Sequence, residues 1–196
     1  MTTVIIKYPA GNVQSVIFAL KRLGVHPLLS DQKEVIKSAD KIILPGVGEA
    51  KSAMRYLRKK GLHEILPSLK QPILGICLGM QLFCKYSEEN DTICLGIFDL
   101  YVNKFICSKP GYKVPHMGWN TIFHLKGKIF EGMGENHFQY FVHSYYVPTS
   151  IYTIASAEYI CTFSAALQKD NFYATQFHPE KSSYEGQKIL QNFIKL

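Results

Sequence analysis

Cys77 lies between two glycines in the segment Gly75-Ile76-Cys77-Leu78-Gly79, where a short apolar stretch is expected to turn into a helix. This spacing is typical of the nucleophile elbow of hydrolases, with cysteine in the place of serine. The glycines leave room for a sharp turn, and the start of the following helix favours a thiolate. The N–H of Leu78 can also serve an oxyanion. A buried cysteine in a close-packed turn is the alternative, but the two glycines and the strand–helix junction favour a nucleophile.

A base for this thiol is predicted in the segment Gln176-Phe177-His178-Pro179-Glu180. A thiol nucleophile needs a base, and the base needs a group that orients it. Pro179 pushes His178 toward an extended backbone, so that the side chains of His178 and Glu180 project to one side. We therefore expect Glu180 to hold the imidazole while its other nitrogen faces Cys77. A surface histidine beside a solvated glutamate is the alternative, which is favoured for such a pair taken alone.

The segment Leu44-Pro45-Gly46-Val47-Gly48 follows another predicted strand. It falls at the carboxyl edge of the strands, where open α/β sheets bind ligands. Two glycines that bracket one residue allow a peptide N–H to approach a substrate closely, or to rotate toward it. A phosphate-binding loop is the rival interpretation. The chain has no GxGxxG or Walker lysine pattern, so nucleotide binding is not expected.

The first half of the chain alternates short apolar strands with segments of helical periodicity. Strands are predicted at 4–8, 25–29, 41–44 and 73–76, and helices from Asn12 to a stop at Gly24, over 52–60, and from Leu78 onward. Such alternation indicates parallel βαβ units with helices on both faces of a sheet.

The second half is richer in β-branched and aromatic residues. Antiparallel strands on the edge or face of the main sheet are predicted at 93–106, 121–123, 138–147, 151–158 and 162–168, followed by a return strand at 172–177 and a closing helix at 183–194. We therefore predict one α/β domain over residues 1–196.

Composition narrows the class of protein. The chain has 196 residues, 47% hydrophobic and 19% charged, which excludes a disordered or membrane-spanning chain. The five scattered cysteines form no CxxC pair, which argues against a disulfide framework or a zinc site and favours a cytoplasmic location. No export signal is evident before Val4. The net charge of +7 permits nucleic-acid binding, but the basic residues form only brief pairs such as Lys59–Lys60, so a solvated basic surface is favoured.

Several segments resemble motifs of the class I (triad) glutamine amidotransferases, in the family's order and over nearly the whole chain. They are YPAGNVQSV (8–16), LPGVG (44–48), GICLGMQLF (75–83), VPHMGWN (114–120), YFVHSYY (140–146) and FHPEKS (177–182). The elbow and the His-Pro-Glu segment are common to the superfamily. The PGVG and PHMGWN segments are most similar to the branch that serves histidine biosynthesis, rather than the anthranilate-, CTP- or pyridoxal-phosphate-linked branches.

The resemblance implies a flavodoxin-like three-layer α/β/α fold and a glutaminase reaction without a cofactor or metal. Cys77 would form a γ-glutamyl thioester, His178 would transfer protons and Glu180 would orient His178. Leu78 and Val47 would form the oxyanion hole, Val47 after rotation of the Gly46–Val47 peptide. The implied substrate-binding residues are Gly46, Gly48, Gln81, Glu89, Ser144 and Tyr145. Glu89 suits the ammonium group of glutamine, and Ser144 and Tyr145 match the segment near its carboxylate. A polar helix residue and a solvated acid are the alternatives for Gln81 and Glu89.

Members of this branch pass ammonia to a cyclase with a (β/α)8 barrel. A barrel needs about 250 residues, so the cyclase is expected on a separate chain, with no nucleic-acid or membrane partner. Trp119 and Asn120 match a motif that faces the partner, although a lone tryptophan is more often in the core.

The chain departs from the family pattern at Lys7 and Pro9 and at Glu49-Ala50-Lys51. Both loops are candidates for facing the partner, so we expect these departures to affect docking to the partner and activation by it. The rival functions are a glutaminase subunit of another amidotransferase, a free-standing cysteine hydrolase of the same fold, and a non-catalytic regulatory module. The intact Cys77, His178 and Glu180 argue against the last of these.

Overall fold

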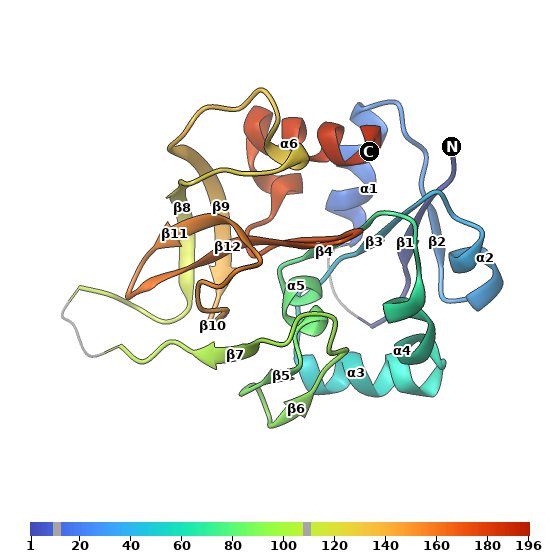
Figure 1. Cartoon of the computed structure of the whole chain (residues 1–196), viewed down its shortest axis with the longest axis horizontal. Helices are drawn as coiled ribbons and strands as arrows, with labels where there is room; N and C mark the ends of the chain where they lie inside the picture. Colours follow the sequence, from blue (N-terminus) through green and yellow to red (C-terminus); the bar gives the residue numbers. More distant parts are fainter. Residues whose placement is uncertain (10–12, 108–110) are drawn as a thin grey trace.

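A seven-stranded sheet forms the centre of the protein (Figure 1). The computed structural model describes residues 1–9, 13–107 and 111–196. Five parallel strands lie in the order β2 (Leu28–Ser30), β1 (Thr3–Ile6), β3 (Lys41–Leu44), β4 (Ile73–Ile76) and β13 (Phe172–Thr175). This order is that of flavodoxin-like sheets, so the predicted fold class is confirmed. The antiparallel strands β12 (Thr162–Lys169) and β11 (Thr153–Glu158) extend the sheet beyond β13.

Helices cover both faces of this sheet, as the alternation of strands and helices predicts (Figure 1). Helices α2 (Lys33–Lys37), α3 (Ala50–Lys59), α4 (Leu62–Ile65) and α5 (Leu78–Phe83) pack on one face, and α1 (Val13–Arg22) and α6 (Ser183–Lys195) on the other. Side chains of a strand point alternately to the two faces. Thus Val4 and Ile6 of β1 enter the first core, whereas Ile5 enters the second.

Helix α3 shows why these segments become helical. Its buried side chains are Ala50, Ala53, Met54 and Leu57, the spacing of one helix face, and they pack in the core beneath the sheet. Helix α1 ends at Arg22, and Gly24 follows with φ of 77°, as the predicted stop requires. The predicted start of this helix at Asn12 lies outside the described residues. The short helices α2 and α4 were not predicted from the sequence.

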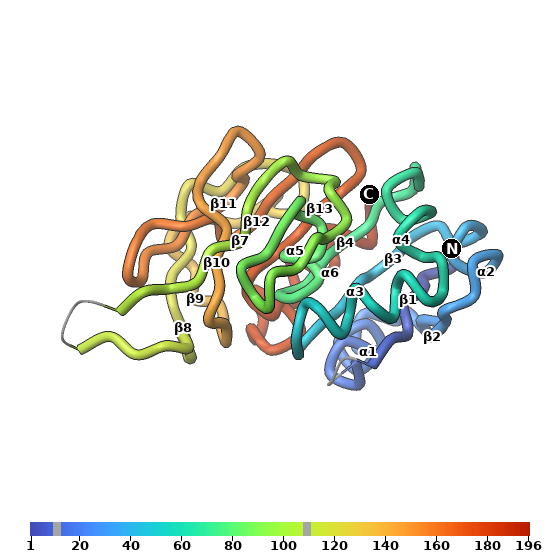
Figure 2. Tube along the Cα trace, turned by 90° about the horizontal axis from the view of Figure 1, so that it is seen from below, coloured from blue at the N-terminus to red at the C-terminus, as the bar shows by residue number. Residues whose placement is uncertain are grey.

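The prediction for the middle of the chain is partly wrong, because most of its strands form two separate sheets. Strands β8 (His116–Ile122) and β9 (His137–His143) form a two-stranded antiparallel sheet of their own in the described part of the chain. Strands β10 (Tyr145–Tyr146), β7 (Tyr101–Lys104), β5 (Tyr86–Ser87) and β6 (Thr92–Ile93) form the other sheet. In Figure 2 the β8–β9 ribbon lies at one end of the molecule, far from α2 and β2. Among the described residues, the remaining helical structure is three single turns, η1 (Leu66–Ser68), η2 (Lys128–Phe130) and η3 (Pro179–Lys181).

Two predicted strands are each broken in two. The segment 93–106 turns through Gly96, which has φ of 70°, and the segment 138–147 is interrupted at Ser144. In the described part of the chain, no helix is both long enough and apolar enough to cross a membrane.

Candidate active site

Cys77 occupies a strained turn between β4 and α5. Its φ of 52° and ψ of −103° are unusual for a residue with a side chain, and such strain is often found at functional sites. A Cβ atom on Gly79 would overlap the carbonyl oxygen of Leu44, and one on Gly75 would come within 2.8 Å of the Gly79 backbone. Close packing therefore requires both glycines that define the elbow motif.

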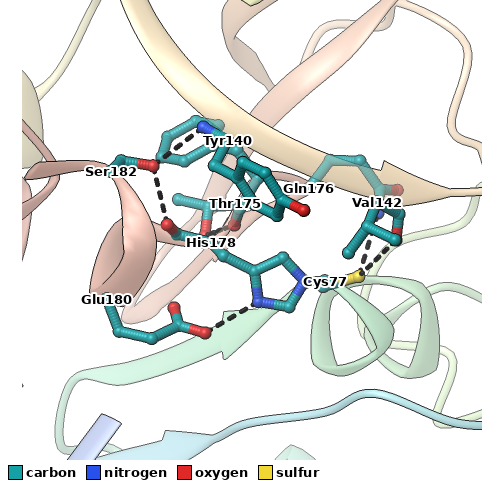
Figure 3. A network of polar contacts seen from close by, with 9 residues as sticks. Cys77, Tyr140, Val142, Thr175, Gln176, His178, Glu180 and Ser182 are labelled. Atoms are coloured by element: carbon teal, nitrogen blue, oxygen red, sulfur yellow. Dashed lines mark hydrogen bonds and ion pairs between the residues drawn. The ribbon is translucent and has the colours of Figure 1, made fainter. Parts of the chain in front are cut away.

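The thiol of Cys77 is buried and has one polar neighbour on β9 and one in the bend just after β13 (Figure 3). Its Sγ lies 3.8 Å from the carbonyl oxygen of Val142 and 3.6 Å from Nε2 of Gln176. The Cys77 N–H donates to the carbonyl oxygen of Thr175 over 2.7 Å, which ties the elbow to β13. The sulfur is thus fixed at the carboxyl edge of the parallel strands, where the sequence places it.

His178 lies between Cys77 and Glu180 (Figure 3). Its Nδ1 is 2.7 Å from Oε1 of Glu180, and the two side chains are only 2% and 4% exposed. The Nε2 edge of the ring faces the thiol and makes no hydrogen bond to another described side chain. Burial alone would lower the pKa of His178, but Cys77 and Glu180 together raise it to about 10. The environment therefore favours an imidazolium beside the sulfur.

The backbone around His178 is held by hydrogen bonds to β9. The N–H of His178 donates to the carbonyl oxygen of Tyr140 over 2.9 Å. The hydroxyl of Ser182 donates to the carbonyl oxygen of His178 over 2.7 Å and accepts the N–H of Tyr140 over 2.9 Å (Figure 3). The imidazole is thus fixed by the backbone as well as by Glu180.

The oxyanion hole expected from Leu78 and Val47 is not formed in this conformation. The N–H of Leu78 donates to the carbonyl oxygen of Gly46 over 3.3 Å. Because a trans peptide directs its C=O and N–H to opposite sides, the N–H of Val47 points away from that of Leu78. Rotation of the Gly46–Val47 peptide would exchange the carbonyl for the N–H. Gly48 has φ of 132° and open space around its Cα, so it can absorb such a change.

A cavity of about 290 Å³ opens beside Cys77. Small-ligand sites start at about this size. Among the predicted binding residues, Gly48, Gln81, Glu89, Ser144 and Tyr145 line it, together with Val47, Cys77 and Leu78. Gly46 is different, because it packs against Tyr8 and Leu78 and contributes its carbonyl group.

Glu89 connects the cavity to helix α3. Its Oε2 accepts the N–H of Ala50, the first residue of the helix, over 2.7 Å. Partial burial raises the pKa of Glu89, while this N–H acts in the opposite direction. Nearby, Oε1 of Glu49 accepts a hydrogen bond from Asn90, so the unusual segment after Gly48 is tied to the loop that carries Glu89.

Trp119 and Asn120 point to opposite sides of β8. Trp119 is 53% exposed and lies on the outer face of the β8–β9 ribbon with Met117 and Phe138, which are 63% and 59% exposed. The side chain of Asn120 donates to the carbonyl oxygen of Glu158 over 2.8 Å. The alternative of a core tryptophan is therefore wrong, and of the two residues only Trp119 presents a large free surface.

The sequence motifs assign no role to Gln176, which the structure places in contact with Cys77. Gln176 is fully buried two residues before His178, directly after β13 and before the buried Phe177. A glutamine beside apolar residues at the end of a predicted buried strand is a signal for a polar role, and it can be read from the sequence alone. No cluster of three metal-ligating side chains occurs within residues 1–9, 13–107 and 111–196.

Comparison with known proteins identifies the class. The model of the family "Glutamine amidotransferase class-I" matches residues 4–196, and the chain belongs to this family. Solved structures agree on the fold: one glutamine amidotransferase superposes with a TM-score of 0.75 at 18% identity, covering 98% of this chain and 97% of that one. Another, from Thermotoga maritima, gives 0.72 at 13% identity, covering 100% and 96%.

Sequence relatives are more specific. The "Imidazole glycerol phosphate synthase subunit HisH" of Bacteroides fragilis strain YCH46 is 57% identical over 196 residues, covering 100% of both chains. The proteins of the same name from Bacteroides thetaiotaomicron and Shewanella sediminis are 55% and 46% identical, covering 100% of this chain and 100% and 91% of theirs. The predicted branch of the family is thereby confirmed.

Proposed function

We propose that this chain is the glutaminase subunit of an imidazole glycerol phosphate synthase. It hydrolyses glutamine to glutamate and ammonia, and a cyclase subunit uses the ammonia to make imidazole glycerol phosphate and an aminoimidazole carboxamide ribotide. The observation that carries the proposal is the strained, buried Cys77 facing the His178–Glu180 pair at the edge of a cavity.

In the first half-reaction the Cys77 thiolate attacks the side-chain carbonyl carbon of glutamine, and the carbonyl oxygen becomes an oxyanion. His178 Nε2 then gives its proton to the departing nitrogen as the C–N bond breaks, so that ammonia leaves and a γ-glutamyl thioester remains. The raised pKa of His178, about 10, supports this assignment because it keeps the proton available at neutral pH.

In the second half-reaction water attacks the thioester. His178, now neutral, takes a proton from that water, the C–S bond breaks, and glutamate leaves as the thiolate is restored. Glu180 keeps Nδ1 protonated throughout, because its carboxylate can only accept the hydrogen bond of 2.7 Å. This fixed tautomer directs Nε2 toward the reacting atoms.

Glutamine would lie in the cavity with its amide at Cys77. Glu89 provides a carboxylate for the substrate ammonium group, and pairing with it would offset the effect of burial on Glu89. The segment Ser144–Tyr145 also lines the cavity and suits the substrate carboxylate. Gln81 lines the same cavity and offers its amide group.

The partner would be a (β/α)8-barrel cyclase on a separate chain. The exposed Met117, Trp119 and Phe138 give the β8–β9 ribbon an apolar outer face suited to a protein partner. Val142 of the same ribbon lines the cavity, so docking here would bring the partner close to the site of ammonia release. Neither a nucleic acid nor a membrane is part of the proposal, and the reaction belongs in the cytoplasm.

The proposal is tested by assaying glutamate formation from glutamine with the chain alone, with the cognate cyclase, and with the cyclase plus its ribonucleotide substrate. We expect weak activity alone and strong activity in the complete mixture. High activity of the chain alone that the cyclase does not change would contradict the subunit assignment and favour a free-standing hydrolase. No activity in any mixture would contradict the glutaminase assignment.

A further inference from the structure

Gln176 makes hydrogen bonds that link the nucleophile to the substrate cavity. Its Nε2 lies 3.6 Å from Sγ of Cys77, and its Oε1 accepts a hydrogen bond of 3.1 Å from Nε2 of Gln81. The same Nε2 of Gln81 also donates to the carbonyl oxygen of Tyr145 over 3.2 Å. Three segments of the site are therefore joined through two amide groups.

The direction of each hydrogen bond follows from one group that can only accept. The carbonyl oxygen of Tyr145 has no proton, so the Gln81 atom facing it must be the NH2 nitrogen. That nitrogen can only donate, so the Gln176 atom that it contacts must be the amide oxygen. The other end of the Gln176 amide, which faces Sγ, must then be the NH2 group. The amide of Gln176 thus directs a donor at the nucleophile.

Gln176 is also held firmly in place. It is fully buried, and its backbone N–H donates to the carbonyl oxygen of Ala165 over 2.8 Å. A buried amide with both ends engaged has a single favoured orientation. Turning the Gln176 amide over would place its NH2 group against that of Gln81 and its oxygen against the Cys77 thiolate.

We propose that Gln176 is a further residue of the glutaminase site, whose amide donates to the Cys77 thiolate and at the same time fixes the orientation of the Gln81 amide toward the substrate. This inference rests on the proposed function and adds a residue to it. A hydrogen bond to an ionised sulfur is stronger than one to a neutral thiol, so this donor favours the thiolate. With its nitrogen held by Gln176 and Tyr145, Gln81 is left with its oxygen for the substrate.

Two titratable groups also act on the charge of Cys77, in addition to the neutral amide of Gln176. They are His178, whose pKa the thiolate raises, and Tyr8, whose pKa is raised by burial and then by Cys77. Tyr8 donates its hydroxyl proton to the carbonyl oxygen of Pro45. A test of Gln176 must therefore leave His178 and Tyr8 unchanged.

The test measures alkylation of Cys77 by iodoacetamide between pH 5 and 10 in the full chain, read as modification of the peptide that contains Cys77. In Gln176→Met, which removes the donor at similar length, we expect the pH midpoint of alkylation to rise by about one to two units. In Gln81→Met, which leaves the Gln176 donor in place, the midpoint should stay near that of the wild type. The KM for glutamine, measured with the cyclase, should rise in both variants.

Gln139→Met is the matched control, because Gln139 is equally buried but makes no side-chain hydrogen bond to a described residue. It should change neither the alkylation midpoint nor the KM. If Gln176→Met does not fold, Gln176→Asn takes its place, since it keeps an amide that is one methylene too short for both contacts. A wild-type midpoint and KM in a folded Gln176 variant would overturn the inference. If the wild-type chain showed no glutaminase activity with the cyclase, the proposed function would instead be overturned. The alkylation result would still decide the role of the Gln176 donor.

Discussion

The N–H of Leu78 and the carbonyl oxygen of Gly46 are joined by a hydrogen bond of 3.3 Å. This contact occupies one donor that the oxyanion needs and turns the N–H of Val47 away from it. In the isolated chain the proposed nucleophile, its proposed base and the cavity lie together, whereas the proposed oxyanion hole is closed. The site therefore lacks only the rotated conformation of the Gly46–Val47 peptide that would open the oxyanion hole.

This closed hole predicts low glutaminase activity for the chain alone. Loss of one oxyanion donor costs about 10²- to 10³-fold in kcat, and here neither donor is available. We expect the cognate cyclase with its bound ligand to raise kcat by at least about 10²-fold. Steady-state assays of glutamate release check this, and equal kcat values with and without the cyclase would show that the hole opens without help.

Glu180→Gln is expected to lower kcat/KM by about 10²-fold or more, because His178 loses the group that fixes its tautomer and stabilises its charge. The pH dependence gives the sharper test. In the wild type, activity that requires protonated His178 should persist through neutral pH and fall as the pH approaches about 10. Without the Glu180 carboxylate the pKa of His178 falls, so this alkaline limit should move to lower pH. An unchanged limit would remove Glu180 from the proposed role.

Trp119→Ala should weaken the complex with the cyclase by about tenfold or more, since exposed tryptophans at interfaces often dominate binding. Because the indole is 53% exposed, the melting temperature of the chain alone should change little. Binding by isothermal calorimetry provides the measurement. Ile151→Ala is the control, because Ile151 is 92% exposed and lies in the turn before β11. Equal affinities for both variants would place the interface elsewhere.

Gly79→Ala should destabilise the fold by about 3 kcal/mol, because the added methyl group would overlap the carbonyl oxygen of Leu44. Gly134→Ala should change the free energy of unfolding by less than about 1 kcal/mol, since its Cβ would meet only His137 at an ordinary 3.6 Å. Urea unfolding of both variants tests whether packing demands the glycine of the elbow. Similar free energies for the two variants would contradict this explanation.

Stability should also fall on mild acidification because of His143. Burial lowers the pKa of this side chain to about 3, and its Nδ1 donates to the carbonyl oxygen of Tyr145 over 2.8 Å. Between about pH 6.5 and pH 5 the unfolded chain takes up a proton at this position and the folded chain does not, so acid favours unfolding. The expected contribution of His143 to this slope approaches about 1.4 kcal/mol per pH unit. His143→Asn, whose Nδ2 can replace the donor, should reduce this slope in urea titrations, and an unchanged slope would assign it to other groups.

Much of the parallel sheet could be predicted from the sequence, because its strands are short apolar runs with clear boundaries. Strands β3 and β4 match the predicted residues, with Pro45 after one and Pro72 before the other. The second half could not be predicted as well, since apolar alternation shows that a strand exists but not which strand pairs with it. For example, strands β8 and β9 form a separate ribbon, whereas the sequence predicts strands on the edge or face of the main sheet.

Part of the candidate site could likewise be predicted from the sequence, and part of it could not. The local motifs predict the turn at Cys77 and the contact of His178 with Glu180, since both depend on neighbouring residues. The orientation of the Gly46 carbonyl and the contact of Gln176 with Cys77 depend on segments about 30 and 100 residues apart in the chain. Neither could be predicted from spacing along the sequence.

The central claim is that Cys77 releases ammonia from glutamine for use by a second subunit. It is tested most directly by Cys77→Ala in the complex with the cyclase, assayed for synthesis of imidazole glycerol phosphate from glutamine and, separately, from ammonium salt. We predict no synthesis from glutamine and wild-type synthesis from ammonia. Synthesis from glutamine at the wild-type rate, or loss of both activities in a complex that still assembles, would contradict the claim.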